Sequence, residues 1–511
     1  MPPTPFWAKP KFVLSVILLY LAVHFAIRMA MGPALATDDA EQALFSQHFA
    51  WSYRYRAPPL FTWLLVTLGE VIPVGVVAIS LLRYALLGVT YVFAYFTARR
   101  LIADPRLAAL AVYSFAAIHT FSESSHRELT HTTTLAALIA VAWYVLIRLS
   151  AAPRLGWYLA LGASFGLGML AKWNFVVLAA TLPLACLIRR DFRPLVLTWK
   201  LLPAAALAAV VVLPTVIATL HAGAPAGEDV RSVFSAGGER GLGQIAKSTL
   251  QLLHTAFIYP LPLLPILLII LGLPLWRGLR AGTPEAHPDP VRPDAAFVAT
   301  TIAIGLALLW ALIPLVGATE FKVRYMYPVL FILPTLLFML IERGRPSSRA
   351  INLFGLVLIA PALQVPIERL MAGFSDDCGL CLERAPFDRL AAGLRTAGYD
   401  GSGTMVVNEV SAGGNFRVAF PNARIVEPGF PLTSWPPPFD DGPCILVWQE
   451  PAEPAASVVP PRLTTYLTDA LAGDPRAPHR DGDVSAPAHM QEAKLHRIGY
   501  RLYDRAVGDC R

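Results

Sequence analysis

The chain has 511 residues, of which 55% are hydrophobic and only 15% are charged, and its mean hydropathy is +0.53. This composition excludes a soluble globular protein and indicates an integral membrane protein, because soluble domains carry about 25% charged residues. A spanning helix needs about 20 mostly apolar residues to cross roughly 30 Å of hydrocarbon.

Apolar runs between charged residues or Pro and Gly breaks predict about eleven membrane-spanning helices. They lie near residues 12–31, 77–98, 104–120, 130–148, 156–171, 174–188, 196–219, 252–274, 296–317, 326–341 and 351–371. The predicted fold is therefore an all-α polytopic membrane domain over residues 1–371, with a first outside loop at 32–76. A small α/β domain follows at 372–511, where the composition becomes polar and rich in Pro and Gly.

The orientation follows from the Lys and Arg residues of the short loops. The set of loops that begins with Lys9 and Lys11 carries more of them than the opposite set. This predicts a multi-pass protein of a bacterial inner membrane with a cytoplasmic N-terminus. With an odd number of spans, the C-terminal domain is then periplasmic.

Within the C-terminal region, hydrophobic patterning predicts strands, helices and loops in alternation. The strands are expected at 404–408, 423–426, 445–449 and 497–503, the helices at 387–397 and 462–471, and loops at 435–439 and 474–488. The region also holds Cys378, Cys381, Cys444 and Cys510, for which we expect structural disulfides in an oxidising compartment. Redox activity or half of a metal site is the alternative for the Cys378 and Cys381 pair.

Three carboxylates open the first outside loop. A helix that starts here could use Asp38 as its N-cap and Glu41 to complete a capping box, and Asp39 would complement the helix dipole. This structural explanation requires no chemistry. It does not account for the basic residues that lie in several outside loops, against the orientation rule.

These outside basic residues are expected to meet at one face of the membrane domain. Such a cluster would bind an anionic head group, and phosphate is the natural ligand because Arg offers bidentate donors and Lys a point charge. Interfacial snorkelling is the alternative for any single member. The members are Arg54, Arg56, Arg127, Lys172, Lys322 and Arg324.

Four motifs in this order resemble a known family. They are TDDAEQ at 37–42, RAPPLFTWL at 56–64, GASFGLGMLAK at 162–172 and RYMYP at 324–328. They are similar to the acidic motif, the Pro-Pro-Leu element, the glycine-rich span ending in Lys and the late Arg-Tyr element of the GT-C membrane glycosyltransferases. The resemblance is closest to protein O-mannosyltransferase-like enzymes, the aminoarabinose transferases of lipid A and the rhizobial galacturonosyltransferases, and it covers most of residues 10–340.

The resemblance implies transfer of a sugar from a polyprenyl-phosphate donor to an acceptor outside the membrane. By motif position it implies that Asp38 is the catalytic base with Asp39 as helper, and that Lys172 and Arg324 bind the donor phosphate. Many relatives have Lys before Pro-Pro, where this chain has Ala57. Arg54 or Arg56 is the expected replacement, and Lys322 is expected beside Arg324.

The chemistry fits these residue types, because displacement of a lipid phosphate needs a base for the acceptor and cations for the leaving group. A further polar segment, 122–131, includes His126 but shows no metal-ligand spacing. No cofactor is firmly implied, and a divalent metal has no supporting ligand set. Substrate contacts are expected from Glu41, Arg127, Glu128, His131 and Tyr325.

The expected partners are a polyprenyl-phosphate-linked sugar, membrane lipid and an acceptor that is lipid A, another glycolipid or a protein, with no nucleic acid. Two functions of other classes stay open at this point. A lipid-linked glycan transporter or flippase would place polar residues along a path through its helices, whereas the predicted spans here are mostly apolar. A non-catalytic envelope glycan assembly protein would not depend on Asp38.

Overall fold

The computed structural model describes residues 4–53, 58–221, 241–281, 293–373, 375, 382–450 and 458–511. Arg54, Arg56, Cys378 and Cys381 lie outside the described residues. The chain forms two compact units. Unit 1 comprises residues 1–23, 55–58 and 83–366, and unit 2 comprises residues 24–54, 59–82 and 367–511.

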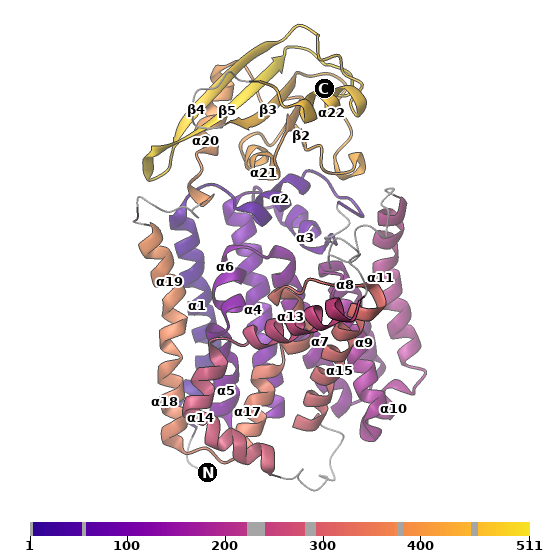
Figure 1. The fold of residues 1–511 in the computed structure, drawn as a ribbon, viewed down its shortest axis with the longest axis vertical. Helices are drawn as coiled ribbons and strands as arrows, with labels where there is room; N and C mark the ends of the chain where they lie inside the picture. The colour runs from indigo at the N-terminus through magenta and orange to yellow at the C-terminus, as the bar shows by residue number, and fades with distance from the viewer. Residues whose placement is uncertain are drawn as a thin grey trace. The chain divides into compact units, whose positions relative to one another are not determined.

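Unit 1 is a bundle of helices (Figure 1). An α-helix pairs its own backbone N–H and C=O groups, which is necessary in a membrane because hydrocarbon offers these groups no partners. Its α-helices are α1 (Pro10–Met31), α4 (Val76–Leu101), α5 (Pro105–Tyr113), α6 (Ser125–Arg127), α7 (Thr130–Ala151), α8 (Leu155–Ala171), α9 (Phe175–Ile188), α10 (Arg193–Val196), α11 (Leu201–His221), α13 (Leu242–Ile258), α14 (Leu263–Arg280), α15 (Ala295–Val316), α16 (Tyr327–Leu330), α17 (Leu333–Arg343), α18 (Ser348–Val357) and α19 (Ile359–Gly373). Helices α1, α4 and α19 each continue into unit 2.

Seven of the described helices are long and apolar enough to cross a membrane, or eight if one bent pair counts as a span. They are α1, α4, α7, α11, α14, α15 and the segment Ser348–Ala372, with α16 and α17 as the bent pair. Helices α3 (Leu60–Gly69), α8 and α9 are shorter and apolar. The predicted helices near 12–31, 77–98, 130–148, 156–171, 174–188 and 296–317 are confirmed to within a few residues.

The predicted single span at 252–274 is wrong. Helix α13 ends at Ile258 and α14 begins at Leu263, and Figure 1 shows α13 running across the upright helices. The intervening segment contains Pro260 and Pro262, and proline removes a helical donor and clashes with the preceding turn. Because the hydropathy is high on both sides of this break, the sequence pattern predicted one continuous helix.

Two other predicted spans are also interrupted. The one at 326–341 is bent by 50° between α16 and α17. The one at 104–120 ends as an α-helix at Tyr113 and continues as the 3-10 helix Ser114–Ala117 and a π-helix, Thr120–Ser124. π-helical turns inside helices are frequent at functional sites, and this one lines the cavity described below.

Unit 2 contains a five-stranded sheet with the strand order β2-β1-β3-β5-β4 (Figure 1, yellow). Strands β1, β2 and β3 are parallel, whereas β3, β5 and β4 pair antiparallel. The strands are β1 (Thr404–Val407), β2 (Arg424–Val426), β3 (Cys444–Glu450), β4 (Arg480–Ala488) and β5 (Gln491–Tyr503); the helices are α2 (Thr37–Phe45), α3, α20 (Phe387–Thr396), α21 (Val410–Ala419) and α22 (Pro461–Asp469). The predicted strands at 404–408, 423–426, 445–449 and 497–503 and both predicted helices are confirmed.

The prediction of a loop at 474–488 is wrong, because β4 occupies most of it. This edge strand is polar, and its carboxylates pair across the ladder with arginines of β5. Asp481 accepts two hydrogen bonds from Arg501, at 2.7 and 2.8 Å, and Asp483 accepts one from Arg497 at 3.0 Å. Cross-strand ion pairs thus replace the apolar alternation that identifies a strand in a sequence.

One of the expected disulfides is present. Cys444 at the start of β3 is bonded to Cys510 near the end of the chain, with a sequence separation of 66 residues. Closing a loop of that length is worth about 4 kcal/mol in the chain-entropy treatment. The bond therefore fixes the C-terminal segment against the central strand of the sheet.

Candidate active site

Unit 1 contains a polar cavity of about 310 Å³ at the end of the bundle where α7 begins. Two segments that are distant in sequence form its wall, residues 120–129 and 322–324. Its lining residues are Thr120, Glu123, Ser124, Arg127, Glu128, Leu129, Lys322, Val323 and Arg324. Four of these were predicted from the sequence as site residues.

The two wall segments are joined by hydrogen bonds. The Tyr327 hydroxyl donates to the carbonyl of Thr120 at 3.1 Å and lies 3.2 Å from the Ser125 hydroxyl. The Thr255 hydroxyl of α13 donates to the carbonyl of Phe321 at 3.0 Å. These buried polar contacts hold α16 against the π-helical segment and the loop before α16 against α13.

The backbone around the cavity departs from regular structure. Between α6 and α7, Leu129 has φ 66°, which is the left-handed region that branched residues rarely adopt. Leu129 is nearly buried and lines the cavity itself. Strain of this kind persists where the surrounding structure enforces it, and it concentrates at functional sites.

Three cations and two carboxylates line the cavity, so its net charge is positive and favours the binding of an anion. Arg127 donates to Glu123 at 2.7 Å, one helical turn apart. Lys322 lies 3.6 Å from Glu320. Arg324 is half-buried, and within the described part of the chain its Nε is buried without a hydrogen-bond partner. A guanidinium with a buried, unpaired Nε gains more binding free energy from an oxyanion than a fully solvated guanidinium does.

Lys172 follows α8 at the same end of unit 1. Its ammonium donates to the Thr132 hydroxyl at 2.7 Å, in the first turn of α7. That turn comes directly after the cavity residues Glu128 and Leu129. Thr132 therefore sets the direction of the Lys172 side chain from the helix that follows the cavity wall.

The acidic motif lies in unit 2, in the first turn of α2. The residue before this helix is Ala36, and its side chain makes no capping bond. The capping explanation, with Asp38 as N-cap and Glu41 in a capping box, is therefore wrong. Asp38 is half-buried and Asp39 is 1% exposed, and carboxylates at these positions are stabilised by the positive end of the helix dipole.

The Pro-Pro-Leu motif continues as α3, which packs beside α2. The Thr62 hydroxyl donates to the Gln42 side chain at 2.6 Å, so the first two motifs are joined directly. In the described part of the chain that follows α2, the Tyr53 hydroxyl donates to the carbonyl of His48 at 2.7 Å. Burial raises the pKa of Tyr53 to about 12, so this hydroxyl remains a donor at neutral pH.

The C-terminal domain holds α2 in place through α21. Asn415 accepts from the backbone N–H of Leu35 at 2.8 Å and donates to its carbonyl at 3.1 Å. A Cβ built at Gly414 would lie 2.0 Å from the carbonyl oxygen of Ala40, so only glycine permits this approach. Leu44 and Phe45 of α2 belong to the same hydrophobic core as the sheet.

The predicted site residues that the structure describes thus fall into three groups. Arg127, Glu128, Lys322 and Arg324 meet at one cavity, and Lys172 lies on the helix that follows its wall. His131, half-buried in α7, and Tyr325, buried beside Arg324, do not line it. Asp38, Asp39 and Glu41 share α2 in unit 2, while Arg54 and Arg56 are outside the described residues.

Sequence reasoning missed Glu123, which pairs with Arg127. Its spacing of four residues from Arg127 was the available signal, since such pairs are neighbours on a helix. Within the described residues, no group of three or more His, Cys, Asp or Glu side chains is placed to hold a metal ion.

Comparisons with known proteins indicate that the chain is a glycosyltransferase. A family model described as dolichyl-phosphate-mannose-protein mannosyltransferase matches residues 56–217. The chain is 26% identical over 465 residues to the lipopolysaccharide core galacturonosyltransferase RgtA of Rhizobium johnstonii, covering 88% of this chain and 89% of the relative. It is also 26% identical over 463 residues to RgtB of the same organism, with 89% and 90% coverage.

Two solved structures share the fold. The structure of ArnT from Cupriavidus metallidurans bound to undecaprenyl phosphate aligns with a TM-score of 0.61 at 15% identity, covering 96% of this chain and 98% of that one. The apo state of the same protein aligns with a TM-score of 0.55 at 16% identity, covering 95% and 98%. The predicted fold class is confirmed by this similarity and by the helical unit with its C-terminal sheet.

Proposed function

We propose that this chain, a multi-pass membrane glycosyltransferase of the GT-C type, transfers a galacturonic acid residue from a polyprenyl-phosphate donor to a hydroxyl of the lipopolysaccharide core. The relatives that match along most of the chain are named for this sugar and this acceptor. The observation that carries the proposal is the cavity at which Arg127, Lys322 and Arg324 converge.

The cavity supplies what the departing lipid phosphate needs. Arg324 would bind phosphate oxygens with two parallel N–H donors, and Lys322 and Lys172 would add point charges. These cations stabilise the negative charge that grows on the leaving oxygen as the glycosidic bond breaks. A donor that carries a uronic acid adds a carboxylate, for which the Arg127 guanidinium is a second anion partner.

Asp38 is the proposed base, and Asp39 is its helper. The acceptor hydroxyl oxygen attacks the anomeric carbon and its proton passes to Asp38, while the bond from that carbon to the phosphate oxygen breaks and its electrons leave with polyprenyl phosphate. A base and a phosphate site on opposite faces of the sugar would give inversion of configuration. We further propose that the N-terminus is cytoplasmic and that this chemistry takes place on the periplasmic side.

Protein O-mannosylation is the second candidate, favoured by the family model that matches residues 56–217. The two functions differ in product. Mass spectrometry of lipopolysaccharide and of envelope proteins, from cells with and without this chain, separates them. We expect loss of a hexuronic acid increment from the lipopolysaccharide core, whereas loss of a hexose from proteins would support the second function and contradict the first.

Removing the hydroxyl that orients Lys172 should weaken donor use selectively. In Thr132→Val the ammonium loses the Thr132 hydroxyl as an acceptor while the side chain at 132 keeps its shape, and one charge-assisted hydrogen bond corresponds to a rise in donor KM of about tenfold. Thr134→Val is the matched control, because the Thr134 hydroxyl donates to the Thr130 carbonyl of its own helix. Equal effects of the two substitutions on KM would contradict the role given to Lys172.

Pushing α2 away from the C-terminal domain should slow transfer without weakening donor binding. Gly414→Val forces a side chain onto the backbone of Ala40, and a displacement of about 1 Å at a reacting group can lower kcat by about 10²-fold. Gly243→Val is the control, since a Cβ there would meet nothing within 4 Å. Steady-state kinetics on reconstituted enzyme measures both, and an unchanged kcat in Gly414→Val would show that α21 does not position the base.

A further inference from the structure

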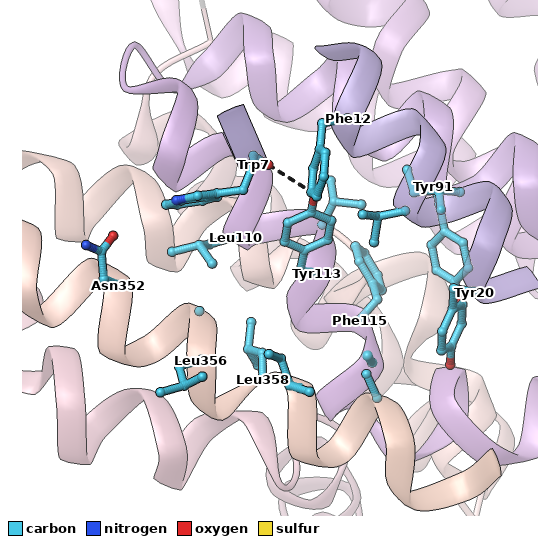
Figure 2. A pocket seen from close by; sticks show the side chains of 17 residues that line it. Trp7, Phe12, Tyr20, Tyr91, Leu110, Tyr113, Phe115, Asn352, Leu356 and Leu358 are labelled. Carbon is cyan, nitrogen blue, oxygen red and sulfur yellow. Dashed lines mark hydrogen bonds between the residues drawn. The ribbon is translucent and has the colours of Figure 1, made fainter. Parts of the chain in front are cut away.

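A second cavity of unit 1, of about 470 Å³, is separate from the polar one (Figure 2). It lies between α1, α5 and the α18–α19 segment, with Tyr91 contributed by α4. None of the residues that line the polar cavity lines this one. The proposed function gives it no role.

The wall of this cavity is almost wholly apolar. Its few polar groups include Tyr113, whose hydroxyl donates to the carbonyl of Trp7 at 3.3 Å (Figure 2), and Asn352, which lies at the edge of the group of labelled side chains. Cavities lined by aliphatic and aromatic side chains stay dry and accept hydrocarbon. The ligand that fits this cavity is therefore a hydrocarbon chain, with any polar part outside.

The cavity has the length of one leaflet. Along α1 it extends from Phe12 to Tyr20, and along α18 and α19 from Asn352 to Ala362. At the rise of an α-helix these stretches are about 12 and 15 Å long, and the hydrocarbon of one leaflet is about 15 Å deep. Leu356 is 64% exposed although it lines the cavity, so the cavity opens onto the surface of the bundle.

Two cations flank the end of the cavity where α1 and α18 begin. Lys9 directly precedes α1 and comes three residues before the lining residue Phe12, and Arg349 lies in α18, three residues before the lining residue Asn352. Both side chains are exposed, and within the described part of the chain neither forms an ion pair. Exposed cations at the start of a membrane helix attract the head groups of anionic lipids. Here such cations lie beside an apolar cavity.

We propose that this cavity binds one acyl chain of an anionic glycerophospholipid, whose phosphate head group lies at Lys9 and Arg349. The lipid comes from the leaflet nearest the start of α1. This site is distinct from the donor site at Arg324, and it stands whether or not the proposed transfer reaction is correct.

Native mass spectrometry of the delipidated full-length protein, incubated with phosphatidylglycerol or phosphatidylcholine, tests the site. We expect one phosphatidylglycerol to bind in preference to phosphatidylcholine, and we expect Lys9→Ala and Arg349→Ala each to reduce that preference about fivefold. Gly355 lines the cavity, and Gly355→Leu should weaken phosphatidylglycerol binding at least about tenfold, because excluding two methylene groups has that effect.

Gly272→Leu is the matched control, because it is the same change in a helix where a Cβ would meet nothing within 4 Å, and it should leave lipid binding unchanged. The charge variants do not alter packing, so they test the site even if Gly355→Leu folds poorly. Equal binding of the two lipids, binding unaffected by Gly355→Leu in folded protein, or preferential binding of undecaprenyl phosphate in this cavity would each overturn the proposal.

Discussion

Asp38→Asn is expected to lower kcat for sugar transfer by about 10²- to 10⁴-fold, the usual contribution of a general base. The amide has nearly the same shape as the carboxylate, so α2 keeps its contacts, but it cannot accept the proton of the acceptor hydroxyl. Because Ala36 and not Asp38 precedes the helix, and no side chain caps it, the substitution removes no capping bond. Initial rates with reconstituted enzyme and a polyprenyl-phosphate sugar measure the effect.

Asp469→Asn, an exposed carboxylate at the end of α22, is the matched control and should leave kcat unchanged. Asp38→Glu should recover part of the activity, since it restores a base at a shifted position. Donor binding should survive in Asp38→Asn, because the proposed phosphate site does not include Asp38. Full turnover in a folded Asp38→Asn protein would remove Asp38 from the mechanism.

Arg324→Ala is expected to reduce kcat/KM for the donor by about 10²- to 10³-fold, as removal of a donor to a developing oxyanion does. The substitution takes away a half-buried guanidinium whose Nε has no partner in the described part of the chain. Arg324→Lys keeps the charge but not the bidentate geometry, so its loss should be smaller. Donor titrations at fixed acceptor concentration give the two kinetic constants separately.

Arg100→Ala serves as the comparison, because it removes an exposed arginine at the end of α4 that lines neither of the two cavities. Its donor kinetics should match those of the unmodified protein. A loss in Arg324→Ala no larger than that in Arg100→Ala would mean that Arg324 is an ordinary interfacial cation, and the phosphate site would have to be sought at other residues.

The fold was predictable where hydrophobic patterning is strong. Long apolar runs became helices such as α7 and α15, and β1 and β3 followed from their buried branched residues. The errors have local causes. Prolines at 260 and 262 divide an apolar run that hydropathy treats as continuous. Strand β4 is stabilised by carboxylate and guanidinium pairs, and the sequence of such a polar strand resembles that of a loop.

The site was predictable in part for a different reason. The topology rule identified Arg127, Lys322 and Arg324 as cations on the unexpected side, and their convergence follows from short loops at one end of a bundle. The pairing of Glu123 with Arg127 was missed although its four-residue spacing was available, and the role of Thr132 was not predicted because it depends on a contact with Lys172, 40 residues away. The contact between α21 and the residues before α2 was also not predicted, because the hydrogen bond from Leu35 to Asn415 joins residues that are 380 positions apart in the sequence.

A structure of the protein with bound undecaprenyl phosphate, determined by cryo-electron microscopy, is the most direct test of the proposed mechanism. We predict that the phosphate lies within hydrogen-bonding distance of the Arg324 guanidinium in the polar cavity of unit 1, and that the Asp38 carboxylate faces the same hollow. A phosphate bound away from residues 120–129 and 322–324, or an Asp38 side chain directed away from the bound lipid, would contradict it.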